Sequence, residues 1–203
     1  MSNYPELYIL RHGQTEWNVE GRMQGNLDSP LTPKGRDQAK TQGRLLRSLG
    51  LEAVPYPCLS SPKGRAFETA SIALSEISCV PVVDARLCET DLGSWQNCLL
   101  RDLRPNCPAD LWQDLGPSWY FFNAPDGESF ESQRDRCKSL LDGLHGPAIL
   151  VTHGITSRVL RGLWLGLGYR DTVLLPDGQG GVFHMKNEGQ WLCSPQNPTG
   201  EAC

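Results

Sequence analysis

The sequence predicts an α/β protein in which a mostly parallel sheet lies between two layers of helices. Two apolar stretches end abruptly in a histidine followed by a glycine, at His12 and at His153. Such short apolar runs, alternating with helical segments, are typical of buried parallel strands. Open sheets of this kind bind ligands at the carboxyl ends of their strands. We therefore expect a three-layer α/β/α sandwich with both histidines at one pocket.

The composition is that of one soluble globular domain. The chain has 203 residues, of which 39% are hydrophobic and 21% charged, and its formal net charge is −4. This length suffices for a single core, so we expect residues 1–203 to form one domain. No apolar stretch approaches the ~20 residues of a membrane span, and the negative charge argues against non-specific nucleic-acid binding. The first residues lack the features of a secretory signal, so we expect a cytoplasmic protein, monomeric or homodimeric.

The eight cysteines show no pattern of a metal site or a redox motif. None forms a C-x-x-C pair, and no cysteine and histidine cluster has the spacing of a zinc site. Several lie inside apolar runs, as small buried thiols do. We expect reduced cysteines, of which Cys88 is notable because it adjoins Glu89.

Capping residues indicate where three helices begin. Thr32-Pro33 supplies an N-cap and a proline at the first helical position, and Gly50 ends that helix. Ser60-Ser61-Pro62 predicts a second helix capped in the same manner. Ser129 is the expected cap of a third helix, which runs to Leu144.

The remaining segments are interpreted as strands, loops and a cap. We expect strands at 7–10, 56–59, 80–83 and 148–151, a helix at 155–165, and closing strands near 173–174, 182–183 and 191–192. Residues 13–32 form a long polar, glycine-rich loop, which we expect to line a pocket. The segment 97–125 has little pattern and is expected to cover the site, and the tail at 194–203 is expected to be loose.

The residues after the first strand carry groups suited to an anion. Arg11 offers a guanidinium fork, and His12 offers an imidazole that can attack or shuttle protons. Gly13 allows a sharp turn or a close backbone approach, and Thr15 and Asn18 add short hydrogen-bonding side chains. An Arg-His pair after a strand is common. The second histidine-glycine turn, near the other end of the chain, is what favours a shared functional site.

Several different short motifs follow one another in a fixed order along most of the chain. They are Leu10-Arg11-His12-Gly13, Asn18, Gly21-Arg22-Met23-Gln24-Gly25, Asp28-Ser29-Pro30-Leu31-Thr32, Ser60-Ser61-Pro62 with Arg65-Ala66, Leu87-Cys88-Glu89, Asp126-Gly127-Glu128-Ser129 and Val151-Thr152-His153-Gly154. Each is weak alone, but the ordered set resembles the histidine phosphatase superfamily, also called the phosphoglycerate mutase-like family. It looks most like the broad-specificity phosphatase and α-ribazole phosphatase branch. The resemblance implies the three-layer fold and chemistry through a phosphohistidine.

The resemblance also implies a role for each matching residue. His12 corresponds to the nucleophile, whose pKa the neighbouring guanidinium groups should lower. The phosphate-clamping set corresponds to Arg11, Arg65 and His153. A cation in the first turn of a helix opposes the helix dipole, and an anion bound beside Arg65 would relieve this conflict. Glu89 corresponds to the acid that protonates the leaving oxygen, and a bound phosphate would favour its protonated form.

Five further positions are expected to bind the substrate or its phosphate. They are Asn18, Gln24, Gly154, Thr15 and Glu128. The implied mechanism needs no metal and no other cofactor. The chain departs from many related phosphomonoesterases after Trp95, where Gln96-Asn97 stands in place of Glu-Gly, and this puts the local loop and substrate recognition in doubt.

Three functions remain open at this point. We favour a metal-independent phosphomonoesterase that hydrolyses a small phosphorylated metabolite, since the chain is shorter than cofactor-dependent phosphoglycerate mutases and lacks their substrate-enclosing segments. A cofactor-dependent phosphoglycerate mutase is the second interpretation, in which a hydroxyl collects the phosphoryl group in place of water. The third is an inactive phospho-ligand binding protein, against which the presence of His12, Arg65 and Glu89 argues.

Overall fold

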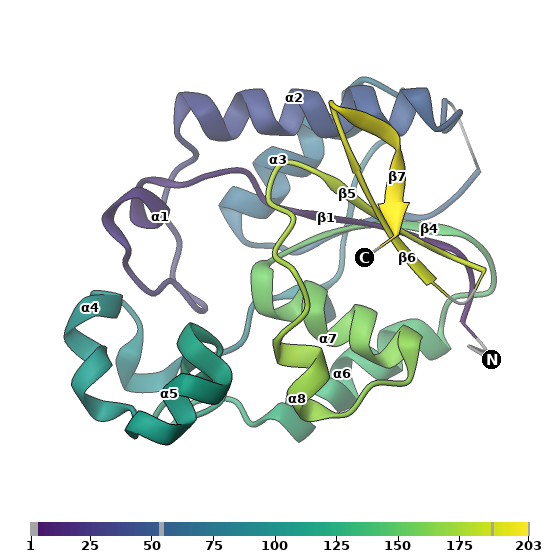
Figure 1. Ribbon diagram of the computed structural model, residues 1–203. Helices are drawn as coiled ribbons and strands as arrows, with labels where there is room; N and C mark the ends of the chain where they lie inside the picture. The colour runs from purple at the N-terminus through teal and green to yellow at the C-terminus, as the bar shows by residue number, and fades with distance from the viewer. Residues whose placement is uncertain (1–3, 53–54, 188, 203) are drawn as a thin grey trace.

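A computed structural model describes residues 4–52, 55–187 and 189–202. This part of the chain forms one seven-stranded sheet in the order β3-β2-β4-β1-β5-β6-β7 (Figure 1). The strands are β1 Leu7–Arg11, β2 Cys58–Ser60, β3 Val82–Val83, β4 Ala148–Thr152, β5 Val182–Lys186, β6 Gly189–Ser194 and β7 Asn197–Ala202. The half from β3 to β1 is parallel, and β5, β6 and β7 continue it antiparallel. The predicted α/β class is confirmed, with a sheet that is mixed because the closing strands are hairpins.

Helices cover both faces of the sheet, which confirms the predicted three layers. The helices are α1 Glu16–Glu20, α2 Pro33–Ser48, α3 Gly64–Ser75, α4 Leu100–Leu103, α5 Ala109–Leu115, α6 Phe130–Asp142, α7 Gly154–Leu165 and α8 Tyr169–Val173. Figure 1 shows α2 and α3 on one side of the sheet and α6, α7 and α8 on the other. None of the helices in the described ranges is long and apolar enough to cross a membrane.

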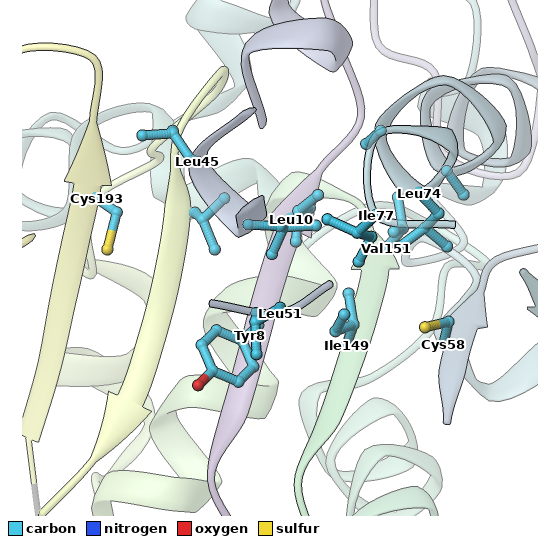
Figure 2. Close-up of a cluster of buried hydrophobic side chains, with 14 residues drawn as sticks. Tyr8, Leu10, Leu45, Leu51, Cys58, Leu74, Ile77, Ile149, Val151 and Cys193 are labelled. Carbon is cyan, nitrogen blue, oxygen red and sulfur yellow. The ribbon is translucent and has the colours of Figure 1, made fainter. Parts of the chain in front are cut away.

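The two faces of the central strand β1 contribute side chains to two separate hydrophobic cores. Tyr8 and Leu10 pack with residues of α2 and α3, as Figure 2 shows. Leu7 and Ile9 pack with residues of α6 and α7 on the opposite face. Successive side chains of a strand point to opposite faces, so a strand between two helical layers is apolar at every position. This explains the uninterrupted apolar run before the first histidine.

Two of the three predicted helix caps are confirmed. The Thr32 side chain accepts a hydrogen bond from the backbone N–H of Gly35, and Ser129 caps α6 in the same way. The cap predicted at Ser60-Ser61-Pro62 is wrong. α3 begins at Gly64 after Lys63, whose side chain makes no capping bond. The hydroxyl of Ser61 is instead bonded to a ring nitrogen of His153.

Three loop and strand predictions are also corrected. The loop at 13–32 contains the short helix α1, which begins with a reciprocal capping box between Thr15 and Asn18. Residues 173–174 lie at the end of α8 and form no strand. Val173 packs in a cluster with the aromatic side chains of Trp119 and Tyr120. Residues 194–202 of the tail are not loose, since β7 pairs with β6, and Cys203 lies outside the described residues.

The segment 97–125 forms α4, α5 and short 3₁₀ turns, away from the sheet in Figure 1. Its own small core contains Trp95, Trp119 and Tyr120, whose rings meet at tilted or edge-on angles. Among the described residues the cysteines form no disulfide.

Candidate active site

The carboxyl ends of β1 and β4 place two histidines side by side. Arg11 is opposite Thr152 in the register of these parallel strands. The backbone N–H of His12 donates to the carbonyl of Thr152 at 2.9 Å. The ring centroids of His12 and His153 consequently lie 5.2 Å apart, edge to face. Residues separated by most of the chain thus meet at one point, as the sequence predicted.

One ring nitrogen of His12 is held by the backbone, and the other faces a guanidinium group. Nδ1 lies 2.8 Å from the carbonyl oxygen of Gly13, so Nδ1 carries the proton. Nε2 then has a lone pair, to which Nε of Arg65 donates at 3.3 Å. Burial lowers the pKa of His12 well below its usual value, and the charges of Arg65 and Arg11 add to the effect. A neutral ring with an available lone pair is what a nucleophilic histidine requires.

Arg65 is buried and is held from behind by Asp28. Its Nη1 donates to the carbonyl of Leu27 at 2.6 Å and to Oδ1 of Asp28 at 3.0 Å. Its Nη2 donates to the carbonyl of Gly25 at 2.9 Å. Burial lowers the pKa of Arg65, and the hydrogen bond and charge of Asp28 oppose that effect. The conflict with the helix dipole that the sequence indicated is thus relieved in part by a carboxylate of the protein itself.

Two buried nitrogen atoms next to His12 have no hydrogen-bond partner within the described residues. They are Nε of Arg11 and Nδ1 of His153. The other nitrogen of His153 lies 2.8 Å from Oγ of Ser61, and burial followed by the charge of Arg65 lowers the pKa of His153 well below its usual value. The Ser61 hydroxyl can donate to Nε2, and in that tautomer Nδ1 of the neutral ring carries the proton. Buried donors are normally paired, so these two nitrogens indicate a place for an acceptor.

The carboxylate of Glu89 lies at the N-terminus of α7. Oε2 accepts from the backbone N–H of Ile155 at 3.1 Å, and Oε1 accepts from the backbone N–H and the hydroxyl of Thr156, both at 3.0 Å. The backbone N–H of Thr90 is a fourth donor, at 3.0 Å. Only 8% of the residue is exposed. Two backbone N–H groups in the first turn of α7, those of Ile155 and Thr156, therefore bind this side chain.

These side chains line a pocket of about 410 Å³. The predicted residues that line it are Arg11, His12, Arg65, Glu89, Asn18, Gln24 and Gly154. His153 is fully buried and lies outside this lining, in contact with the ring of His12. Pro117, Ser118 and Phe121 line the pocket from the 97–125 segment. No group of three or more histidine, cysteine or acidic side chains in the described residues could hold a metal ion.

Besides His153, two predicted residues lie outside the pocket lining, Thr15 and Glu128. Thr15 is buried, and its hydroxyl accepts from Nε2 of Gln24 at 2.9 Å and from the backbone N–H of Asn18 at 3.2 Å. It therefore supports two pocket residues. Glu128 forms a two-pronged ion pair with Arg136, at 2.7 and 2.8 Å. Arg136 also donates to the carbonyl of Cys88 at 2.9 Å, so Glu128 acts on the segment before Glu89.

The sequence analysis assigned no site role to three charged residues of the pocket, which are Arg22, Arg158 and Asp177. Arg158 lies one helical turn after Gly154 in α7, and Nη1 of Arg158 donates to the Gly154 carbonyl at 3.0 Å. The helical period from the histidine-glycine turn was therefore a signal for it. Asp177 follows α8 in an irregular loop, where no periodic pattern indicates which way a side chain points. Its carboxylate forms an ion pair with Arg11.

Comparisons with known proteins agree with this geometry. Residues 7–190 match the family model described as histidine phosphatase superfamily (branch 1). A protein of Citrobacter koseri named "Probable phosphoglycerate mutase GpmB" is 36% identical over 168 residues, which cover 80% of this chain and 75% of that protein. The protein of the same name from Salmonella arizonae is 35% identical over 170 residues, with the same coverage.

Two solved structures share the fold. A mycobacterial glucosyl-3-phosphoglycerate phosphatase, solved as a complex with VO3, aligns with a TM-score of 0.75 and 32% identity over 92% of each chain. The TTHB049 protein of Thermus thermophilus aligns with a TM-score of 0.66 and 33% identity, over 89% of this chain and 92% of that one. The resemblance seen in the motifs is confirmed, and the chain belongs to the histidine phosphatase superfamily, branch 1.

Proposed function

We propose that this protein is a metal-independent phosphomonoesterase that hydrolyses small phosphorylated metabolites through a phosphohistidine at His12. One observation carries the proposal. The lone pair of His12 Nε2 lies beside Arg65, next to two buried nitrogens of Arg11 and His153 that have no partner in the described residues. A nucleophile among convergent donors is suited to phosphoryl transfer, in which positioning and charge stabilisation supply most of the catalysis.

In the first step, Nε2 of His12 attacks phosphorus opposite the leaving oxygen. The P–N bond forms as the P–O bond breaks, and Glu89, which is protonated in the complex with the phosphate, gives that proton to the departing oxygen. Nε of Arg65, which now donates to Nε2 at 3.3 Å, turns its hydrogen bond to a phosphoryl oxygen. Arg11 and His153 donate to the other oxygens, so that the charge is spread over several donors.

In the second step, water attacks the phosphohistidine. Glu89 takes a proton from that water, the P–N bond breaks, and the electron pair returns to Nε2 of His12. The Nδ1 hydrogen bond to the Gly13 carbonyl holds the ring in one orientation through both steps. Inorganic phosphate and neutral His12 are the result.

The organic part of the substrate would contact the 97–125 segment. Pro117, Ser118 and Phe121 from this segment line the pocket, which supports the expectation that it caps the site and influences substrate choice. A single domain and a cytoplasmic location, as a monomer or homodimer, remain expectations from the sequence. The intact set of His12, Arg65 and Glu89 argues against an inactive binding protein.

The names of the curated relatives favour a second candidate, a phosphoglycerate mutase. Both reactions form the same phosphohistidine, and they differ in whether water or a second hydroxyl receives the phosphoryl group. Two assays on the purified protein separate them. One measures phosphate release from a panel of phosphorylated metabolites, and the other measures conversion of 3- to 2-phosphoglycerate. We expect phosphate release, and mutase turnover without appreciable hydrolysis would contradict the proposal.

A further inference from the structure

We infer that Asp177 is a positioning residue of the phosphate site, which acts through Arg11 as Asp28 acts through Arg65. The inference rests on the proposed function of the pocket. Asp177 lies between α8 and β5, far in the chain from both arginines, and its carboxylate is at the pocket.

The geometry of Arg11 supports this role. A guanidinium group has two edges, because Nη1 lies on the side of Cδ while Nε and Nη2 point the other way. Asp177 binds Nη1. Nε, which belongs to the opposite edge, is buried without a partner in the described residues. A Cβ atom placed on Gly154 would be 3.4 Å from both that Nε and Cζ, so the guanidinium group packs against a glycine that lines the pocket.

Arg65 repeats the arrangement. Asp28 accepts from its Nη1 at 3.0 Å, and its Nε points to Nε2 of His12 at 3.3 Å. Each arginine is therefore held at Nη1 by an aspartate, and each turns its Nε edge away from that aspartate. For Arg65 that edge is known to face the nucleophile. The contact of Asp177 with Nη1 of Arg11 would in the same way fix the orientation of a second guanidinium group around the same phosphoryl group.

The loop that carries Asp177 is itself tied to α7. Nε of Arg158 donates to the carbonyl of Leu175 at 2.7 Å, and Nη2 of Arg161 donates to the carbonyl of Pro176 at 2.7 Å. The second carboxylate oxygen of Asp177 lies 3.9 Å from Nη2 of Arg158. Burial alone would raise the pKa of Asp177, but the charges of Arg11 and Arg158 outweigh it and lower that pKa. The carboxylate is thus charged, mainly because of Arg11, while the loop that carries it is placed by contacts that do not involve Arg11.

A different role would be that of an internal competitor. In that case Asp177 would occupy Arg11 until a substrate phosphate displaces it, and its removal would tighten phosphate binding. The two roles predict opposite changes. The free Nε edge favours positioning, because a phosphoryl group can bind there while Asp177 stays on Nη1.

The test compares Asp177→Ala and Asp177→Asn with Asp142→Ala as the matched control. Asp142 forms an exposed ion pair with Lys138 in α6, outside the pocket lining. The measurements are kcat and KM for p-nitrophenyl phosphate and the inhibition constants of inorganic phosphate and orthovanadate. For Asp177→Ala we expect phosphate to bind about tenfold more weakly, with KM affected more than kcat. Asp177→Asn should recover most of the loss, because its amide oxygen can still accept from Nη1.

A double variant shows whether the effect passes through Arg11. In the Arg11→Gln background, Asp177→Ala should change phosphate affinity by less than about twofold, because the group it orients is absent. An undiminished loss in that background would overturn the inference, as would equal or tighter phosphate binding by Asp177→Ala alone. Thermal unfolding checks that the variants fold, and Asp177→Ser replaces Asp177→Ala if the latter does not. A wild-type protein that neither binds phosphate nor cleaves the ester would instead overturn the proposed function itself.

Discussion

Nε of Arg65 lies 3.3 Å from Nε2 of His12 and donates to it, so the proposed nucleophile is hydrogen-bonded to one of the groups that we expect to bind the phosphate. The long distance makes this a weak bond, which a phosphoryl oxygen can readily replace. Three of the other contacts of Arg65, to Leu27, Asp28 and Gly25, point elsewhere and can persist when phosphate binds. The site is therefore organised before the substrate arrives.

Replacement of the nucleophile should abolish turnover. For His12→Ala we expect hydrolysis of p-nitrophenyl phosphate to fall on the order of 10⁴-fold or more, since no other group can form the covalent intermediate. His145→Ala is the matched control, because that histidine is exposed and is not one of the residues that line the pocket. Unchanged turnover in His12→Ala would remove His12 from the mechanism.

Arg65→Lys should impair catalysis although the charge is kept. A lysine cannot form the fork that contacts Asp28, Gly25 and His12. We expect kcat/KM to fall about 10²-fold or more, as for loss of an oriented donor in the transition state. Arg36→Lys serves as the control, because Arg36 forms an exposed pair with Glu68. Equal activity in the two variants would show that charge alone suffices.

Glu89→Gln should affect poor leaving groups most. We expect a rate loss of order 10²–10⁴ for alkyl phosphates, and a smaller loss for p-nitrophenyl phosphate, because an activated leaving group needs little protonation. Parallel assays of both esters measure the ratio of the two rate losses. Glu131→Gln is the control, because Glu131 is exposed. Equal losses on the two esters would indicate that Glu89 acts by position and not by proton transfer.

Stability should fall as the solution becomes more acidic than the usual histidine pKa. Burial and nearby guanidinium groups lower the pKa of His12 and His153 in the folded state. Below pH ~6.5 the unfolded chain binds protons that the folded protein does not, so stability rises with pH in this window and is lost as pH falls. The expected slope is up to about 1.4 kcal/mol per pH unit for each histidine. Urea unfolding between pH 7 and pH 5 measures it, and the slope should shrink in His12→Asn and His153→Asn; an unchanged slope would contradict the assignment.

Gly13→Ala should destabilise the fold. A Cβ atom at Gly13 would lie 2.2 Å from the backbone oxygen of Gly35 in α2, and that backbone cannot move away alone. We expect a loss of about 3 kcal/mol or more, at the upper end of overpacking effects. Gly146→Ala is the control, because nothing lies within 4 Å of its Cβ position. Urea unfolding distinguishes the two, and equal stability would show that the loop can shift.

The local features of the molecule were predictable because neighbouring residues decide them. The Thr32 and Ser129 caps satisfy backbone groups within three residues, and the apolar runs before His12 and His153 result from burial between two helical layers. The ordered motifs placed Arg65 and Glu89 at the same site, and both line the pocket. Gly13 was correctly expected to allow a close approach, but the partner is the backbone of Gly35.

The sequence by itself determined the α/β class, two of the helix caps and the two histidines at strand ends, because short-range hydrogen bonds and periodic burial leave a local pattern. Only the tertiary structure decided that Ser61 serves His153 and caps no helix, that the N-terminus of α7 binds Glu89, and that Asp177 holds Arg11. These partners are separated by at least 66 residues. Their pairing depends on how the helices pack on the sheet, and no local pattern records that packing.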